Sequence, residues 1–296
     1  MSSERRIARI TTVPPPTPGF VGPGHLAAPV ISPEDFVHND PFIALMDDHL
    51  DIGDRPVGGP HPHAGFETVT LILDGSIYDR DEGGTLNAGE VQWMTAGRGI
   101  IHGENVAAKG KVRLLQLWLV LPPSERWTTP AFQDLHSDAI PIRHADGVDV
   151  RIYSGRSGDV KSATVNHVPV TILEMKMSAT AAIEQEIPAS YNGFVYVIDG
   201  EVRIGRDAAV VKAGQVGWLD SSDSDGRDAL RIVALEDGAR LVIYAGEPQR
   251  APIVSYGPFI GDSENDIHRL FAEYRAGRFE RMSELVRAKR GRIPAG

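Results

Sequence analysis

The chain contains an internal repeat, and this feature most constrains how it can fold. Residues 68–76 resemble residues 193–201, and residues 88–93 resemble residues 213–218. The same offset also places the segment around residue 117 over the one around residue 242. An ungapped repeat of this length indicates duplication of one structural module. The matching positions are 125 residues apart: Gly75 and Gly200, Gly89 and Gly214, Trp93 and Trp218.

Apolar residues recur with a period of two inside the repeated module. Val69, Leu71 and Leu73 lie two apart, as do Val91 and Trp93. This spacing is typical of strands that bury one face. The segment 112–121 is almost continuously apolar and is typical of a strand covered on both faces. We therefore expect an all-β protein built from two copies of one β-module.

Composition argues against several classes of function. The 296 residues carry a net charge of -10, and the first 280 show no concentrated basic stripe, so direct nucleic-acid binding is not expected. No apolar run is long enough to span a membrane. No signal peptide is visible, and we expect a cytoplasmic protein. Because cysteine is absent, histidine and carboxylate side chains are the metal ligands available.

The chain is predicted to have four parts. Residues 1–39 are expected to form an extended arm, since residues 11–29 are rich in Pro and Gly. Residues 40–145 are predicted to form an N-terminal β-domain, and residues 146–262 a second one. Residues 263–296 are predicted to form a C-terminal helix and tail. Ser263 and Asp266 have the spacing of a helix N-cap, and the apolar residues that follow at helical spacing are expected to pack on the sheet.

Histidines form two short clusters inside the N-terminal copy. His61 and His63 flank a proline, and His102 precedes Gly-Glu104. Residues two apart in an extended strand point to the same face, so each pair presents its side chains together. Two such pairs on neighbouring strands would bring three imidazoles and a carboxylate to one point. This set suits a divalent transition metal, but it does not choose among iron, nickel, copper, manganese and zinc.

The identity of the carboxylate is left open by spacing alone. Glu67 lies four residues after His63, so its parity fits as well as that of Glu104. Comparison with the second copy does not choose between the two carboxylates, since neither is retained there: Glu67 is replaced by Asn192 and Glu104 by Ala229. At the positions 125 residues after the four candidate ligands, the second copy has residues of other types, whereas the scaffold residues are the same in both copies. The residues at these positions are Glu186, Pro188, Arg227 and Ala229. We therefore expect the N-terminal copy alone to bind metal.

Three stretches of sequence carry a resemblance to a known family. They are residues 61–76, residues 89–105 and residues 246–279, which include the specific string QWMTAGRGIIH. Over about residues 40–279 the chain resembles the pirin family of the cupin superfamily. The resemblance implies a double-stranded β-helix bicupin, in which two antiparallel β-barrels face each other, with a short C-terminal helix. It also implies one metal, usually iron (Fe2+), in the N-terminal barrel.

The family pattern assigns roles to individual residues. By resemblance the metal ligands are His61, His63, His102 and Glu104, and Glu67 becomes a residue near the metal or in the pocket. Two departures from the family are visible. Ala64 stands where the family often has arginine, and the Pro-rich arm differs from the usual opening, so family partner contacts do not transfer to it.

The resemblance implies two alternative functions. Some pirins resemble quercetin 2,3-dioxygenases, which cleave flavonols with dioxygen; Glu104 would then be the catalytic group that takes the proton of the substrate hydroxyl. Other pirins are regulators that bind a transcription factor or a metabolic enzyme, with the iron as a redox switch. We favour the enzyme. A sugar isomerase is a weaker alternative because the pirin string is intact. Candidate pocket residues near the histidines are Phe66, Glu67, Trp93, Met94 and Arg98.

Overall fold

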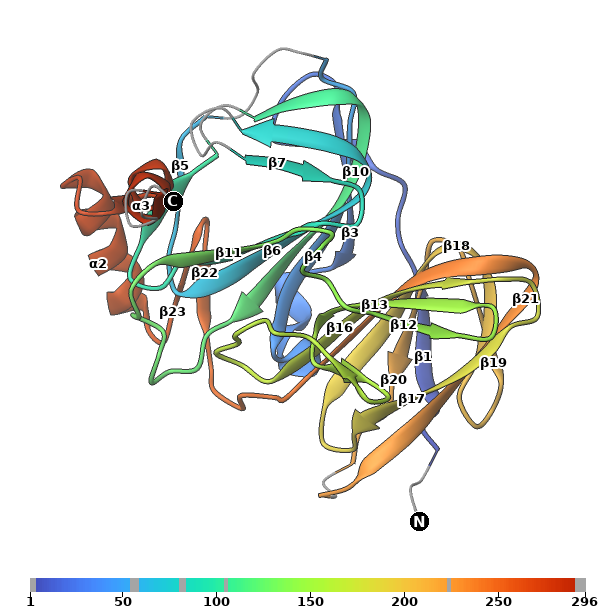
Figure 1. Cartoon of the computed structure of the whole chain (residues 1–296). Helices are drawn as coiled ribbons and strands as arrows, with labels where there is room; N and C mark the ends of the chain where they lie inside the picture. Colours follow the sequence, from blue (N-terminus) through green and yellow to red (C-terminus); the bar gives the residue numbers. More distant parts are fainter. Residues whose placement is uncertain (1–3, 54–58, 80–83, 104–105, 223–224, 291–296) are drawn as a thin grey trace. The chain divides into compact units, whose positions relative to one another are not determined.

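The computed structural model describes residues 4–53, 59–79, 84–103, 106–222 and 225–290 (Figure 1). The chain packs as two compact modules. The first module comprises residues 15–33, 42–137 and 250–296, and the second comprises residues 1–14, 34–41 and 138–249. Within the described residues, no helix is both long and apolar enough to cross a membrane.

The main sheet of the first module has the strand order β11-β8-β6-β10-β4-β3-β2, with β7 beside β6. A smaller sheet has the order β24-β9-β5, and β22 pairs with β23. The elements of this module are β2 (Thr17–Pro18), β3 (His25–Ile31), β4 (Phe42–Leu50), β5 (His61–His63), β6 (Phe66–Asp79), β7 (Gly84–Asn87), β8 (Val91–Thr95), β9 (Ile100–His102), β10 (Val106–Val120), β11 (Ala131–Leu135), β22 (Val254–Tyr256), β23 (Phe259–Gly261), α2 (Glu264–Arg275), β24 (Glu280–Arg281) and α3 (Met282–Arg290).

The main sheet of the second module has the order β1-β20-β18-β21-β16-β13-β12, with β17 beside β21 and β19 beside β18. A 3-10 turn, η1 (Pro33–Asp35), leads into the short helix α1 (Phe36–Asn39). The strands of this module are β1 (Ile7–Thr12), β12 (Ile142–Ala145), β13 (Val148–Ser154), β14 (Arg156–Ser157), β15 (Val160–Lys161), β16 (Val170–Met177), β17 (Ala182–Pro188), β18 (Asn192–Ile204), β19 (Ala209–Lys212), β20 (Gln215–Leu219) and β21 (Arg227–Gly246). The two similar strand orders confirm the expected double β-barrel of the cupin type.

The internal repeat is visible in the strand register. Trp93 of β8 lies opposite Val69 of β6, and Trp218 of β20 lies opposite Phe194 of β18 in the same way. The turn before β8 also recurs before β20. The N–H of Gly89 donates to the carbonyl of residue 72 (2.7 Å), and the N–H of residue 214 donates to that of residue 197 (2.9 Å). Both glycines have positive φ, 84° and 75°, a conformation that residues with a Cβ adopt only with strain.

The offset is not constant through the whole module. Leu117 of β10 lies opposite residue 69, but Tyr244 of β21 lies opposite residue 194, so their separation is 127 residues. Arg113 and Arg240, which face Asp74 and Asp199, show the same spacing. The expected ungapped match of Leu117 with Val242 is therefore wrong. The second copy therefore has two additional residues between β20, the equivalent of β8, and the part of β21 that is equivalent to β9.

The expected N-terminal arm contributes strands to both modules. β1 pairs with β20 in the second module, whereas β3 pairs with β4 in the first. Arg5, just before β1, is 2% exposed. Its guanidinium donates hydrogen bonds to the carbonyls of Tyr191 (2.9 Å) and Ala189 (2.7 Å) and also to those of Pro188 and Asp220. These bonds hold the arm to one end of the second module.

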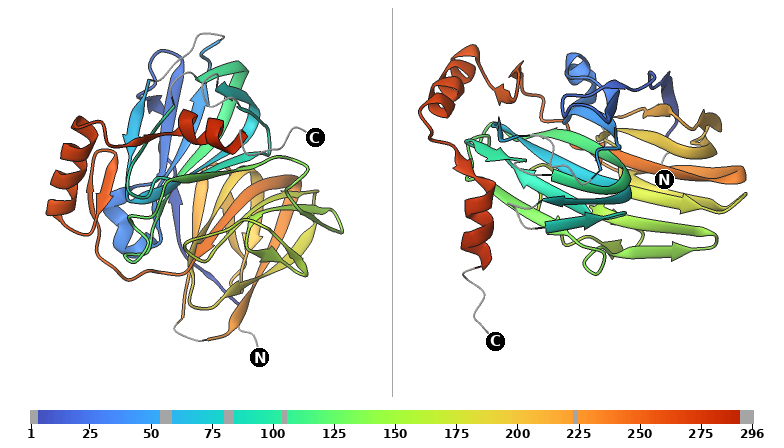
Figure 2. Two further views of the ribbon diagram at one scale, coloured as in Figure 1. Left: turned by 60° about the vertical axis from the view of Figure 1, so that its left-hand side comes forward. Right: turned by 90° about the horizontal axis from the view of Figure 1, so that it is seen from above.

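The C-terminal segment returns to the first module (Figure 2). As expected, Ser263 caps α2 by accepting a hydrogen bond from the N–H of Asp266. Ile267 and Leu270 of α2 are buried in a cluster with Phe259 and Phe279. The tail contains a second helix, α3, which packs on β8 and β9 through a cluster of buried residues: Met94, Ala96, Ile100, Met282 and Val286.

Replacing Arg5 by methionine is expected to destabilise the second module by about 3 kcal/mol, because the carbonyl groups that it contacts lose a buried charged donor. The measurement is chemical unfolding monitored by tryptophan fluorescence. Arg6→Met is the matched control, since the ion pair of Arg6 with Asp220 is half-exposed and should contribute less than about 1 kcal/mol. Equal losses in the two variants would contradict the assigned role of Arg5.

Glu90 makes the first module sensitive to acid. Burial acts to raise the pKa of its carboxyl, but hydrogen bonds from Asn87, Ser137 and His136 lower that pKa to about 2. The stabilisation is therefore complete above the usual pKa of about 4.5 and is lost as the pH falls toward 2. The repeat places Gln215 at the same position, where its side-chain oxygen accepts the N–H of residue 212 (3.0 Å) without titrating.

Glu90→Gln should therefore keep the turn but reduce the dependence of stability on pH. We expect the variant to be less stable than the parent at pH 7, with a difference that shrinks as the pH falls below about 4.5. Urea unfolding at several pH values measures this. Asp138→Asn, at an exposed position, is the control and should follow the parent curve. A constant difference at every pH would show that the charge of Glu90 is not responsible.

Candidate metal centre

The register between β5 and β9 positions three histidines. The two strands are antiparallel, with His61 opposite His102 and His63 opposite Ile100. His63 lies two residues after His61 and shares its face. β5 is the edge strand of its sheet, where Pro62 is tolerated although it cannot donate a ladder hydrogen bond. One pair of short strands therefore carries all three imidazoles.

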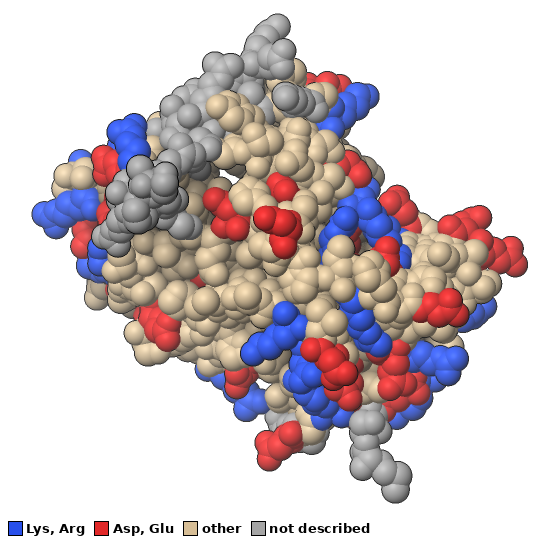
Figure 3. Space-filling model, in the orientation of Figure 1, with Lys and Arg blue, Asp and Glu red and all other residues tan. Residues whose placement is uncertain are grey.

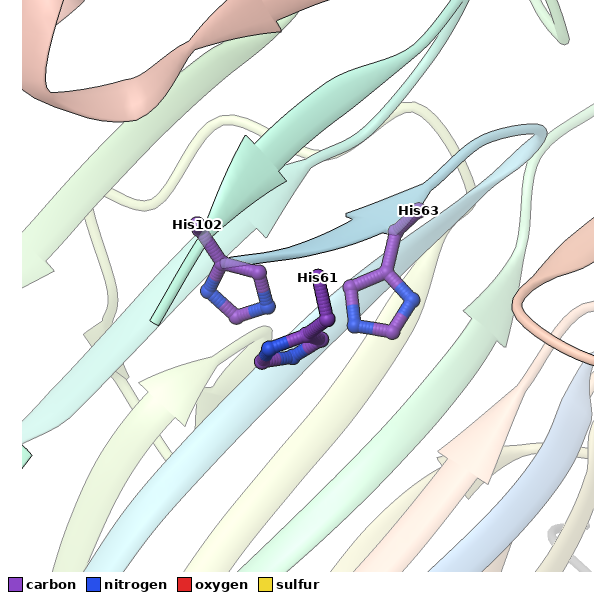
Figure 4. Close-up of side chains that lie close together, drawn as sticks. All are labelled: His61, His63 and His102. Atoms are coloured by element: carbon purple, nitrogen blue, oxygen red, sulfur yellow. The ribbon is translucent and has the colours of Figure 1, made fainter. Parts of the chain in front are cut away.

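The three imidazoles converge (Figure 4). The ring centroids are 4.4 Å apart for His61 and His102, and 4.9 Å apart for each of the other two pairs. One ring nitrogen from each residue lies within 4.8 Å of the others, which is a spacing that a single ion can bridge. Gly103 permits this approach, because a Cβ at that position would lie 2.5 Å from Cε1 of His61.

The hydrogen bonds of the rings leave nitrogens available to a ligand. Nδ1 of His61 donates to the carbonyl of Gly59 (3.0 Å), which leaves Nε2 as the unprotonated nitrogen of a neutral ring. Nδ1 of His63 and Nε2 of His102 are buried and have no hydrogen-bond partner among the described residues. Buried polar atoms without partners are costly, and a bound cation would satisfy them.

The electrostatics of the cluster favour neutral imidazoles. Burial lowers the pKa of His63 to about 3, with a further contribution from neighbouring His61. Burial also lowers the pKa of His102 well below its usual value, and His63 and His61 add to the effect. Neutral imidazoles are the form that ligates a metal. The donor set therefore fits a divalent transition metal.

The expected carboxylate ligand, Glu104, lies outside the described residues. The alternative, Glu67, is fully buried on β6, and its carboxylate accepts a hydrogen bond from the hydroxyl of Thr95 (2.6 Å). Side chains alternate along β6, and Thr70 lines the cavity next to the histidines, so Glu67 points to the other face of the strand.

The remaining predicted pocket residues have different environments. Phe66 contacts His63, with ring centroids 5.2 Å apart. Trp93 is buried on the face of β8 opposite that of cavity-lining Gln92, and Met94 packs under α3. Arg98 is half-exposed and forms an ion pair with Glu280 (2.5 Å).

A cavity of about 400 Å³ opens beside the histidines. Its walls are mainly apolar, and they come from the barrel, the N-terminal arm and the C-terminal segment. The aromatic and aliphatic residues that line it include Phe20, Val21, Leu50, Ile77, Leu86, Leu114, Trp118, Phe132, Met282 and Val286. The polar ones, besides the three histidines, include His25, Asp48, Thr70, Thr85, Gln92, Gln116, Asp134 and His136.

Polar residues cross the floor of the cavity in one row. Gln116 of β10 lies opposite Thr70 of β6, which lies opposite Gln92 of β8, which lies opposite Asp134 of β11. The hydroxyl of Thr70 donates to Gln116 (2.8 Å), and the amide of Gln92 donates to Asp134 (3.3 Å). None of these four residues was among the predicted pocket residues. A signal for this row was the single glutamine inside the apolar run of residues 112–121.

The second module has the same strands but a different interior. The strand register matches Thr70 with Val195 and Gln116 with Ile243, and both apolar counterparts are fully buried. They belong to a large apolar cluster from β13 and from the strands β16 to β21. The register also matches His61 and His102 with Glu186 and Ala229, which lie opposite each other. A constant offset of 125 predicted Arg227 as the counterpart of His102. This prediction is wrong, since the register makes Ala229 the counterpart.

Comparison with known proteins agrees with this architecture. Family models described as Pirin and as the Pirin C-terminal cupin domain match residues 31–119 and 172–280. Human pirin is 36% identical over 254 residues, which cover 82% of this chain and 84% of that protein. A structure from Geobacillus kaustophilus is 37% identical, with a TM-score of 0.77, and covers 85% of this chain and 100% of its own. A quercetin 2,3-dioxygenase from Acinetobacter baumannii is 25% identical, with a TM-score of 0.81 and coverages of 94% and 99%.

The repeated barrels and the histidine cluster in the first of them define a bicupin with a candidate metal centre. Within that class, the extent and identity of the matches assign the family. The chain belongs to the pirin family.

His63→Ala is expected to lower the affinity for a divalent metal by more than about 100-fold, because it removes one of three convergent nitrogens. Glu186→Ala, at the position equivalent to His61 in the second module, should leave metal binding unchanged. Metal titration of the apoprotein followed by elemental analysis measures both. Loss of metal from the Glu186 variant would place a metal site in the second module and contradict the assignment.

Proposed function

We propose that this pirin is a metal-dependent dioxygenase that cleaves a flavonol such as quercetin. The observation that carries the proposal is the convergence of three imidazoles at the wall of a mainly apolar cavity of about 400 Å³. The proposed ligands are His61, His63, His102 and Glu104, and the proposed metal is Fe2+. The similarity to the Acinetobacter quercetin 2,3-dioxygenase supports the reaction class.

The cavity suits a flat aromatic substrate. Its volume lies in the range of pockets that bind small molecules, and aromatic side chains form part of its wall. Trp118 lies next to the metal site, with its ring 5.4 Å from that of His63 and 4.4 Å from that of Phe66. The Trp118 ring lines the cavity, with the buried Phe66 ring tilted against it, so an aromatic ring of the substrate can lie against Trp118.

The residues would divide the chemistry between them. A divalent metal held by the proposed ligands would supply a Lewis acid for the hydroxyl and carbonyl of the substrate in its reaction with dioxygen. In our proposal Glu104 accepts the proton of the substrate hydroxyl. Trp118 holds the ring plane and is supported from behind by Phe66, and the apolar wall excludes water from the reacting atoms. Hydrogen bonding of His61 to Gly59 fixes its ring orientation.

The surface charge is consistent with a small-molecule substrate. On the face shown in Figure 3, the described Lys and Arg residues are interspersed with Asp and Glu residues rather than gathered into one basic patch. The chain also carries a net charge of -10. Both features disfavour phosphate-backbone binding as the main activity.

The proposal predicts oxygen uptake with quercetin by the iron-loaded protein. His61→Ala should reduce the rate at least about 100-fold through loss of the metal, whereas Glu186→Ala should keep the parent rate. An oxygen electrode and the loss of flavonol absorbance measure the reaction. A parent protein that binds iron but consumes no oxygen with flavonols or related enediols would refute the enzyme and favour an iron-dependent regulator that binds a protein partner.

A further inference from the structure

A buried histidine–aspartate pair lines the cavity, and neither residue belongs to the metal site. His25 of β3 is 2% exposed, and its Nε2 lies 2.7 Å from Oδ1 of Asp48 on β4. The N–H of Val21 donates to Nδ1 of His25 (3.2 Å), so the ring is the Nε2–H tautomer and donates to the carboxylate. A Cβ at Gly19 would lie 2.2 Å from the ring, so the backbone packs closely over the imidazole. The pair is rigidly held.

The fold does not require this pair. The register of β3 with β4 matches that of β13 with β16, and it places Val148 and Met175 at the positions of His25 and Asp48. Both counterparts are buried in the apolar cluster of the second module. A buried carboxylate in an apolar wall is costly, and an apolar pair fills the same place in the second copy. The pair therefore has a role other than packing.

The pair lies toward the far end of the cavity from the metal site. Asp48 lies opposite Leu114 of β10, four residues from Trp118, which contacts His63. Four residues of a strand span roughly 13 Å. Phe20 lies between His25 and the metal site: its ring centroid is 5.7 Å from that of His25 and 6.1 Å from that of His61. One flat ligand of two or three rings can therefore reach both ends.

We propose that Asp48, positioned by His25, accepts a hydrogen bond from a substrate hydroxyl remote from the metal. The pair thereby selects polyhydroxylated aromatic compounds over those that carry a hydroxyl at the metal-binding edge alone. The carboxylate can accept this bond because it lines the cavity and its side chain is 12% exposed, while His25 satisfies its other oxygen. This inference rests on the proposed function, since it assumes that the same cavity binds the substrate.

The test compares two probes: 3-hydroxyflavone, which has only the metal-binding hydroxyl and carbonyl edge, and quercetin, which adds four hydroxyls. Binding to iron-loaded protein without oxygen is measured by quenching of tryptophan fluorescence. Asp48→Met copies the second module and should weaken quercetin binding about 10-fold or more, but change 3-hydroxyflavone binding less than about twofold. Asp48→Asn should also weaken quercetin binding, because its single oxygen accepts from Nε2–H of His25 and its NH2 group, which is a donor, then faces the cavity. His25→Val should weaken quercetin binding in the same direction.

Two controls make the outcome decisive. Iron content and thermal midpoint are measured for each variant, and Asp51→Ala, at an exposed position near the pair, should bind both probes as the parent does. Equal effects on the two probes, or no loss of quercetin affinity, would overturn the role of Asp48. Failure of the parent to bind either probe would instead overturn the proposed function, and this inference with it.

Discussion

The antiparallel pairing of β5 with β9 is the interaction on which the candidate site depends. It sets His61 opposite His102, and the two-residue period of the strand brings His63 to the same face. A slip of one residue would turn the side chains of one strand to the other face and disperse the set. β24, from far along the chain, pairs with the other edge of β9 and so supports this register.

The duplicated scaffold shows how one β-module serves two purposes. In the first module, polar side chains from β4, β6, β8 and β10 line an open cavity. In the second, apolar side chains at the matching positions fill the barrel. The guanidinium of Arg5 lies at the end of the second module that corresponds to the metal end of the first, since it donates to the carbonyl of Pro188, the counterpart of His63. In the second module the guanidinium of Arg5, rather than a bound metal ion, therefore supplies the positive charge at this end, and it donates to backbone carbonyls.

The cavity has two chemically distinct ends. The histidine cluster offers unprotonated nitrogens to a cation, whereas the His25–Asp48 pair offers a fixed acceptor to a hydroxyl group. Between them, Trp118 and Phe20 provide aromatic surface. This arrangement favours a ligand that is flat in the middle and polar at both ends. The enzyme that we propose would use the first end for chemistry and the second for selection.

Much of this followed from local patterns in the sequence. Period-two alternation, the repeated glycine turns and the paired histidines predicted the strands, the duplicated β-module and the three imidazoles, whereas the double barrel was implied by the resemblance to the pirin family. The N-cap at Ser263 also followed from a local pattern. The change of offset from 125 to 127 was not predicted, since it arises in a connection whose length only strand pairing reveals.

The sequence by itself determined which residues can ligate a metal and which copy of the repeat holds them. The tertiary structure decided which side chains meet in the cavity. Asp48, Gln116 and Met282 line one cavity although they come from segments far apart in the chain, and Arg5 is buried more than 180 residues from the carbonyls of residues 188 and 189. Their positions depend on sheet order and on the closure of each barrel, and no local period encodes either of these.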